Sequence, residues 1–227
     1  MIKKNIIIAF DLDGTLLDSA DDLIDTLNIL LKDLNIPLVK RSNIKNLVGN
    51  GALAMIKKAF LLNKIKKNKI ELEILKDKFL SIYKKNYANK SKLYPYAKEI
   101  LTKLRLKGYE MIIVSNKPEY YVKKIIHHFH INHFFSAVSG GDTFKYRKPD
   151  PRHLYETIKL TEKKNHECIF IGDSISDALC AKNSKSKLIL LKHGYSNIDI
   201  NTMKADIILD DLKNIPYIIS NLSLNNL

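Results

Sequence analysis

The sequence predicts an α/β fold: a Rossmann-like, doubly wound parallel sheet into which an α-helical domain is inserted. Two observations predict the sheet. Short, continuous apolar runs recur along the chain, and helical patterns separate most of them. Such runs are typical of strands buried on both faces of a parallel sheet, and strand–helix alternation favours a doubly wound arrangement. A third observation, one long stretch with helical patterns only, predicts the insertion.

Five apolar runs are predicted to form the strands. They are rich in Ile, Leu and Val, and they lack the polar alternation of a strand with one solvent-exposed face. In chain order they are residues 6–10 (IIIAF), 110–115 (EMIIVS), 168–172 (CIFIG), 187–191 (KLILL) and 205–209 (ADIIL). A chain of 227 residues is long enough to bury a large core around such a sheet.

Four helices are predicted between these strands, and proline or glycine marks most of their ends. The first follows Pro95 and stops at Gly108, which is the order in which these two residues flank helices. The next two begin at a proline, and the fourth follows a Gly-Asp-Ser turn. The predicted ranges are 96–107, 118–129, 151–160 and 175–184.

The stretch after the first strand breaks the alternation. From Ser19 to about Asn89 there is no strand pattern, whereas three apolar stripes recur at helical spacing. The segment Ser19-Ala20-Asp21-Asp22 looks like a capping box that opens the first helix. We therefore predict a helical cap domain at residues 19–88, inserted into an α/β core domain that consists of residues 1–18 and 89–227.

The net charge of +14 raises the question of nucleic-acid binding. The lysines are spread over the chain, arginine is scarce, and the densest basic run (64–69) has no aromatic neighbours on which bases would stack. We expect no specific nucleic-acid partner, and basic anion or nucleic-acid binding stays as the non-enzymatic alternative. No apolar stretch reaches the length of a membrane span, so we expect a cytoplasmic protein without a membrane partner.

Polar side chains follow three of the predicted strands at the point where each strand ends. Asp11 and Asp13 end the first strand, Ser115 and Asn116 the second, and Asp173 the third. In open parallel sheets, ligands bind beyond the carboxyl ends of the strands. Acids gathered at one edge repel each other unless a cation lies among them, and carboxylates that share a site with a phosphate suit Mg²⁺.

Two further residues extend this set. Lys148, in KPDP (148–151), can supply a positive charge to a phosphoryl group, and Asp177 follows the third strand by one helical turn. A metal, an anion site at a helix start and a spare carboxylate together indicate phosphoryl transfer to an aspartate. A calcium loop is the alternative for Asp-Leu-Asp-Gly, but Leu16 stands where that loop needs glycine. Each motif alone is more often structural; their order on successive strands favours the catalytic interpretation.

The chain resembles the haloacid dehalogenase-like hydrolases. The four ordered motifs of that superfamily are matched by DLDGTLLDS (11–19), VSNKP (114–118), KPDP (148–151) and GDSISD (172–177). Within the superfamily, four other stretches are similar to phosphoglycolate phosphatases: LVGNGA (47–52), YPYAKEILTKLRLKGY (94–109), SGGDTFKYRKPDP (139–151) and HGYSN (193–197). The resemblance implies a haloacid dehalogenase-like core with a helical cap that closes over the leaving group.

The resemblance also implies an activity, the hydrolysis of 2-phosphoglycolate to glycolate and phosphate with Mg²⁺ as cofactor. Asp11 would attack phosphorus and become an aspartyl phosphate. Asp13 would protonate the leaving group and then take a proton from water. The metal would be held by the carboxylates of Asp11 and Asp173 and by the backbone carbonyl of Asp13, whose side chain would avoid it.

The remaining site residues are implied in the same way. The phosphoryl oxygens would be held by Ser115, Asn116 and Lys148. Asp177 would orient Lys148 or a metal-bound water, and Gly172 would support the site beside it.

In the cap, Gly49-Asn50-Gly51 is either a turn between helices or a loop whose backbone amides approach the substrate's carboxylate with help from Arg41. Other interpretations of the same fold are a phosphatase for another small phosphomonoester, such as a sugar phosphate or a nucleotide, and a phosphomutase. We expect a monomer or a homodimer.

Overall fold

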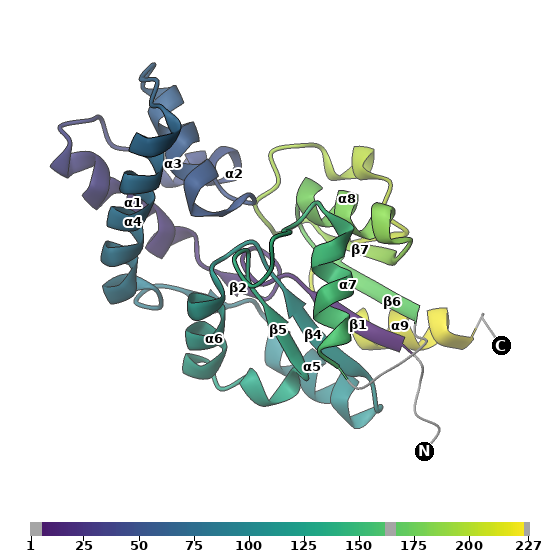
Figure 1. Ribbon diagram of the computed structural model, residues 1–227. Coiled ribbons are helices and arrows are strands. Elements are labelled where there is room, and N and C mark those ends of the chain that lie inside the picture. Colours follow the sequence, from purple (N-terminus) through teal and green to yellow (C-terminus); the bar gives the residue numbers. More distant parts are fainter. Residues whose placement is uncertain (1–5, 162–166, 225–227) are drawn as a thin grey trace.

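The computed structural model of the chain describes residues 6–161 and 167–224, and its centre is a six-stranded sheet (Figure 1). All of its strand pairs are parallel, in the order β5-β4-β1-β6-β7-β8. The strands are β1 (Ile6–Phe10), β4 (Glu110–Val114), β5 (Ala137–Ser139), β6 (Glu167–Gly172), β7 (Lys187–Leu191) and β8 (Ile207–Leu209). The predicted fold class is confirmed. Sequence analysis missed β5, because three residues are too few to show a pattern.

Helices cover both faces of the sheet because alternate strand residues point to opposite sides. Ile8 and Phe10 of β1 pack in one cluster with α5, α6 and α9, whereas Ile7 packs in another with α7 and α8. The helices are α5 (Ala97–Leu106), α6 (Glu119–His128), α7 (Pro151–Lys159), α8 (Ile175–Ser184) and α9 (Ile215–Leu224). Strand order reverses at β1, which lies between β4 and β6, so a crevice opens at the carboxyl end of β1.

The chain between β1 and β4 is largely helical, as predicted. Its helices are α1 (Ala20–Asp33), the 3₁₀ turn Arg41–Asn43, α2 (Ile44–Leu47), α3 (Gly51–Leu62) and α4 (Lys69–Asn86). They form an apolar cluster of their own, with Leu27, Phe60 and Phe79 at most 1% exposed. The division into domains at 19–88 stays a prediction, and its outer ranges include residues 1–5, 162–166 and 225–227, which lie outside the described chain.

The helical segment leaves and re-enters the core through two short strands that pair with each other. Leu17 and Asp18 of β2 (Leu17–Asp18) lie antiparallel to β3 (Lys92–Leu93). Beside them, the hydroxyl of Tyr195 accepts hydrogen bonds from the N–H groups of Ser19 (2.8 Å) and Ala20 (3.1 Å) and donates one to the carboxylate of Asp18 (2.6 Å). The start of the insertion is therefore fixed to a loop that follows β7.

The capping box predicted at Ser19 is wrong. The Ser19 side chain makes no cap hydrogen bond to α1 and instead donates to Oδ1 of Asp13 at 2.6 Å. Asp22, at the third helical position, accepts hydrogen bonds from the backbone N–H groups of Lys90 (2.9 Å) and Ser91 (2.8 Å). Both side chains thus connect the insertion to its surroundings, because charge-assisted partners from elsewhere in the fold compete with the local cap.

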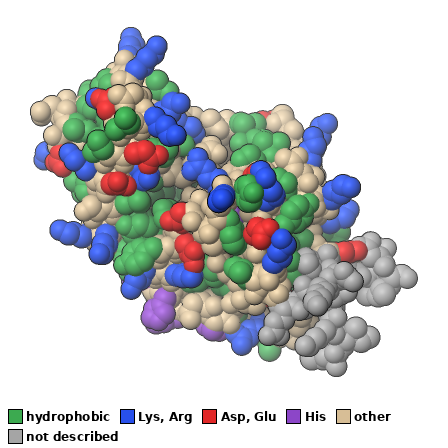
Figure 2. All heavy atoms as spheres, in the orientation of Figure 1, with side chains coloured by type: hydrophobic (Ala, Val, Ile, Leu, Met, Phe, Trp, Pro, Cys, Tyr) green, Lys and Arg blue, Asp and Glu red, His purple; other side chains and the backbone are tan. Residues whose placement is uncertain are grey.

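The surface carries charges of both signs. On the face drawn in Figure 2, Lys and Arg side chains lie scattered over both the helical insertion and the sheet domain, interrupted by acidic and apolar side chains. None of the helices within residues 6–161 and 167–224 combines the length and the apolar character needed to cross a membrane.

Candidate active site

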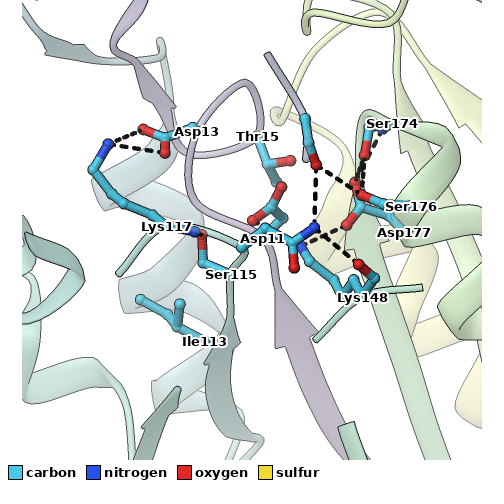
Figure 3. Close-up of polar contacts among 12 residues, drawn as sticks. Asp11, Asp13, Thr15, Ile113, Ser115, Lys117, Lys148, Ser174, Ser176 and Asp177 are labelled. Carbon is cyan, nitrogen blue, oxygen red and sulfur yellow. Dashed lines mark hydrogen bonds and ion pairs between the residues drawn. The ribbon is translucent and has the colours of Figure 1, made fainter. Parts of the chain in front are cut away.

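The polar residues predicted to meet at one edge of the sheet do so in the crevice beyond β1, β4 and β6 (Figure 3). Asp11 follows β1, and its N–H is bonded to the carbonyl of Ile171 in β6 at 2.9 Å. Ser115 follows β4, and its N–H donates to the carbonyl of Ser139 at 3.1 Å. The parallel ladders continue to these residues, so their side chains start from a rigid backbone.

Three buried carboxylates lie close enough to hold one cation. Oxygens of Asp11, Asp173 and Asp177 lie within 4.8 Å of one another. Burial raises the pKa of Asp11 to about 6, although Lys148 acts to lower it. Burial, then repulsion from Asp177 and Asp11, raises the pKa of Asp173 well above its ordinary value. These carboxylates are costly to ionise together without a positive charge among them, and a hard, oxygen-binding divalent cation fits this donor set.

The carboxylate of Asp173 is held by two groups that sequence analysis did not select. Oγ1 of Thr15 donates to its Oδ1 at 2.9 Å, and the N–H of Tyr195 donates to its Oδ2 at 2.8 Å. Gly14, at φ +90°, and Gly194 leave the space that this carboxylate fills, because a Cβ on either would lie within 2.4 Å of Asp173 atoms. Thr15 and Tyr195 lie in the stretches DLDGT and HGYSN, but nothing in the sequence around them indicates that they bind Asp173.

Lys148 lies between two of the acids. Its Nζ is 2.9 Å from Asp11 and 2.7 Å from Asp177, and its side chain is 1% exposed. Burial acts to lower the pKa of Lys148, but the two carboxylates outweigh it and the pKa is raised. The other oxygen of Asp177 accepts the N–H groups of Asp173 and Ser174 at the start of α8. Gly172 allows this approach, since a Cβ there would lie 2.5 Å from Cβ of Asp177.

The side chain of Asn116 is bonded to two backbone carbonyls. Its side-chain amide donates to the carbonyls of Lys148 (3.0 Å) and Gly49 (3.2 Å). Both donor hydrogens are thus used within the protein, and the predicted role of Asn116 in holding a phosphoryl oxygen stays a prediction. The amide instead joins the Lys148 loop to the insertion, which leaves the main-chain N–H of Asn116 as its possible phosphoryl donor.

A buried histidine, also absent from the predicted set, holds the backbone of Lys148. The N–H of Lys148 donates to Nδ1 of His153 at 3.2 Å, and Nε2 of His153 lies 2.9 Å from Oγ of Ser139. Nδ1 is therefore an acceptor, and the ring proton is assigned to Nε2. Burial, with the nearby charge of Lys148, lowers the pKa of His153 to about 4. The ring stays neutral near pH 7, as this hydrogen bond requires.

Asp13 points away from the three acids, toward the insertion. Both of its oxygens lie 3.0 Å from Nζ of Lys117, and in Figure 3 this pair stands apart from the group of Asp11, Lys148 and Asp177. The side chain of Asp13 thus lies apart from the acid cluster, and that it avoids a bound metal stays a prediction. Lys117, missed as a functional candidate although it was quoted in VSNKP, is the residue that binds Asp13 here.

A pocket lies where the crevice meets the insertion. The insertion contributes mostly apolar side chains to it, with the ring of Tyr83 among them. Gly49 (φ +106°) and Gly51 (φ +79°) line it, whereas Asn50 is not among its described lining residues. The carbonyl of Gly49 accepts hydrogen bonds from Asn116 and Ser176, both at 3.2 Å. The GNG loop thus lies against the core site and presents the carbonyl of Gly49 to it.

The structure does not bring Arg41 to the pocket, so its predicted help in substrate binding stays a prediction. Its guanidinium pairs with Asp18, at 3.0 Å, and with Asp21. The side chain is 53% exposed. These two acids flank the start of the insertion and hold Arg41 at the surface, outside the described lining of the pocket.

Comparison with known proteins agrees with this geometry. Residues 8–191 match the model of the haloacid dehalogenase-like hydrolase family. A phosphoglycolate phosphatase of Agrobacterium fabrum is 33% identical over 89% of this chain and 87% of its own length. The chain belongs to the haloacid dehalogenase-like hydrolases.

Two further comparisons place it more closely within that family. A phosphoglycolate phosphatase of Haemophilus influenzae is 34% identical over 90% of this chain and 94% of its own length. A crystal structure of a predicted phosphoglycolate phosphatase from Haemophilus somnus is 33% identical, with a TM-score of 0.87 over 96% of this chain and 99% of that one. The similarity therefore includes the helical insertion as well as the sheet.

The haloacid dehalogenase-like site combines what transfer of a phosphoryl group to a carboxylate requires. Asp11 is a candidate nucleophile beside two acids that can hold a cation. Lys148 carries a buried positive charge next to it. The side chains that form the site are almost completely buried. Because little water reaches them, the electrostatic interactions among them are stronger than at the surface.

Proposed function

We propose that this haloacid dehalogenase-like hydrolase is a Mg²⁺-dependent phosphatase that converts 2-phosphoglycolate to glycolate and phosphate. The observation that carries the proposal is the buried carboxylate of Asp11, which shares its site with Asp173, Asp177 and Lys148. The similarity to phosphoglycolate phosphatases over most of the chain supports the choice of substrate.

Mg²⁺ is the cation we propose, held by the carboxylates of Asp11 and Asp173 and by the backbone carbonyl of Asp13. Asp177 lies within the same cluster and adds negative charge beside it. When bound, Mg²⁺ supplies positive charge that offsets the carboxylates and the phosphoryl oxygens. The raised pKa values of Asp11 and Asp173 support a cation here, because a divalent charge favours their ionised forms.

The first step forms a bond between a carboxylate oxygen of Asp11 and phosphorus while the ester bond to glycolate breaks. Asp13 donates its proton to the departing oxygen, and the product is an aspartyl phosphate on Asp11. Asp13 then takes a proton from a water that attacks phosphorus, and phosphate leaves with Asp11 restored. For this, the side chain of Asp13 must turn from Lys117 toward the phosphoryl group.

The phosphoryl oxygens are held by the hydroxyl of Ser115, the main-chain N–H of Asn116 and the ammonium of Lys148. Ser115 is 1% exposed and lines the pocket with Asp11. Asp177 positions Lys148 through the 2.7 Å ion pair. The apolar wall of the insertion excludes water from the leaving group. Water therefore attacks phosphorus only in the second step, after glycolate has left. We further propose that the enzyme acts in the cytoplasm as a monomer or homodimer.

A panel of phosphoesters, assayed with Mg²⁺ and with EDTA, tests the proposal. We expect phosphate release that EDTA abolishes and a kcat/KM for 2-phosphoglycolate at least tenfold above those for glucose 6-phosphate and for AMP. A preference for a sugar phosphate or nucleotide would instead identify another phosphatase of this family, and conversion of a sugar phosphate to its isomer would identify a phosphomutase. Salt-sensitive DNA retention without any EDTA-sensitive turnover would favour the non-enzymatic alternative.

A further inference from the structure

The pocket between the crevice and the insertion has one marked asymmetry of charge. Its wall from the insertion is built from Leu23, Val48, Ala52, Met55, Phe79 and Leu80, together with Tyr83 and the two glycines. Among the described residues that line the pocket, Lys117 is the only one with a cationic side chain. An anionic group on a leaving group in this pocket thus has one cation to bind.

Lys117 is buried in a way that demands an anionic partner. Its side chain is 4% exposed, and both oxygens of Asp13 lie 3.0 Å from its Nζ. The same nitrogen lies 4.8 Å from the ring centroid of Tyr83, over its face. A buried ammonium without a carboxylate is strongly destabilised, so any movement of Asp13 away from Lys117 requires a replacement for its charge.

The proposed reaction requires that movement. Asp13 must come within hydrogen-bonding reach of the ester oxygen that it protonates. In 2-phosphoglycolate a single methylene group separates this oxygen from the carboxylate. A substrate whose ester oxygen receives the proton of Asp13 therefore brings its own carboxylate to the place where the Asp13 carboxylate met Lys117.

We propose that Lys117 is the specificity-determining residue for the leaving group and that its ammonium binds the carboxylate of a small 2-phosphooxy carboxylate. The proposal rests on the proposed phosphatase activity. Tyr83, from the insertion, covers the ammonium with its ring, and its own ring stacks on Phe79 at 5.8 Å between centroids. These packed rings form a rigid apolar wall beside Lys117.

Two substrates of equal length separate charge recognition from catalysis. 2-Hydroxyethyl phosphate has a hydroxymethyl group where 2-phosphoglycolate has its carboxylate. In Lys117→Met we expect the ratio of kcat/KM for 2-phosphoglycolate to that for 2-hydroxyethyl phosphate to fall by about 10- to 100-fold, the effect of one lost charge-assisted hydrogen bond. The loss should lie mainly in KM. An unchanged ratio overturns the proposal, even if both activities fall, because a role in structure or in holding Asp13 lowers both alike.

The matched control is Lys124→Met. Lys124 is an exposed lysine of α6, placed over the ring of Tyr120 at the surface. Its removal changes the net charge equally and should leave the ratio as in the unchanged protein.

A second pair of variants covers the case in which Lys117→Met leaves Asp13 unpaired and does not fold. Asp13→Asn keeps the ammonium, and Asp13→Asn with Lys117→Met removes both buried charges together. We expect Asp13→Asn to bind 2-phosphoglycolate at least tenfold more tightly than 2-hydroxyethyl phosphate in calorimetry with Mg²⁺, and the double variant to bind both equally. Equal binding by Asp13→Asn overturns the proposal.

The phosphoester panel on the unchanged protein separates a failure of the proposed substrate from a failure of the proposed role of Lys117. If it shows no preference for 2-phosphoglycolate in the phosphoester panel, the proposed substrate and the role of Lys117 both fail. If it shows the preference and Lys117→Met keeps it, only the role of Lys117 fails.

Discussion

The two walls of the pocket differ in the kind of residue they contribute. The sheet side presents Asp11, Asp13 and Lys117 with Asp173 and Lys148 behind them, nearly all shielded from water. The side from the helical insertion presents aliphatic and aromatic groups, and its charged residues mostly face solvent. The charged groups that we propose act on phosphorus thus occupy the rigid ends of parallel strands, whereas the insertion contributes the apolar wall of the pocket.

The two walls also contribute to stability with opposite signs. The acid cluster is costly without a cation, as the raised pKa values of Asp11 and Asp173 show. The apolar cluster of the insertion stabilises the fold, by about 1.5–3 kcal/mol for each fully buried large side chain such as Phe79. The residues proposed for catalysis and the residues that stabilise the fold therefore lie on different sides of the pocket. Substitutions on the two sides should differ in their effects on activity and on the free energy of unfolding.

The largest expected effect is on the sheet side. Asp11→Asn removes the proposed nucleophile and should lower kcat by about 10³-fold or more for every phosphoester, since the proposed covalent intermediate can then no longer form. Steady-state phosphate release measures this. Asp77→Asn, on the exposed face of α4, is the control and should leave turnover unchanged. Retention of a tenth of the activity in Asp11→Asn would show that another group is the nucleophile.

Thermal unfolding in EDTA should move in opposite directions for the two walls. Phe79→Ala opens a cavity in the insertion and should lower the free energy of unfolding by about 3–5 kcal/mol. Asp173→Asn removes a repelling carboxylate and should raise it by about 1–2 kcal/mol, while Mg²⁺-dependent activity is lost. The comparison between the two walls is wrong if Asp173→Asn destabilises the metal-free protein.

A substitution in the GNG loop should affect binding more than chemistry. A Cβ at Gly51 would lie 3.0 Å from the carbonyl of Asn116, so Gly51→Val pushes the loop away from the pocket. We expect KM for 2-phosphoglycolate to rise by about tenfold, with little change in kcat. Gly108→Val is the matched control, because Gly108 has a similar φ of +76° but no atom within 4 Å of the Cβ position. Equal kinetic effects in both variants would mean that backbone strain alone is responsible.

The smallest effect concerns pH. Because the pKa of Asp11 is raised from 3.8 to about 6, the folded metal-free chain holds a proton that the unfolded chain releases in that window. Folding then binds a proton, so stability falls as pH rises from about 4 to 6. In EDTA, the Tm of Asp11→Asn should exceed that of the unchanged protein by roughly 2–4 °C more at pH 6.5 than at pH 5. A difference that does not change with pH would contradict the raised pKa.

The sequence predicted the sheet side of this comparison better than the insertion side. Buried parallel strands show as uninterrupted apolar runs, and the polar residues that end them must meet at one edge. These two rules are enough to place Asp11, Ser115 and Asp173 together. The short strand β5 and helix α9 were missed. A run of three residues has no detectable period, and the apolar start of α9 (IPYII) shows no stripe at helical spacing.

The differences between predicted and observed contacts at the site share a physical cause. Ser19 was assigned to a helix cap and Arg41 to the substrate's carboxylate, whereas in the structure the side chain of each is bonded to an aspartate that the fold brings near. Lys117 and His153 were passed over because the groups they bind, Asp13 and the backbone of Lys148, become neighbours only when the loops after the strands are in place. Periodicity and motif spacing do not indicate which side chains of distant segments will contact each other.

The antiparallel pairing of β2 with β3 has a consequence for how such proteins diversify. Asp18 and Lys92 are paired across this ladder, so the helical insertion leaves and re-enters the sheet domain at the same place. A different inserted domain whose two ends lie close together can replace this one at the same position without altering the strand order of the sheet. The site at the sheet edge then stays the same, while the domain that covers it changes.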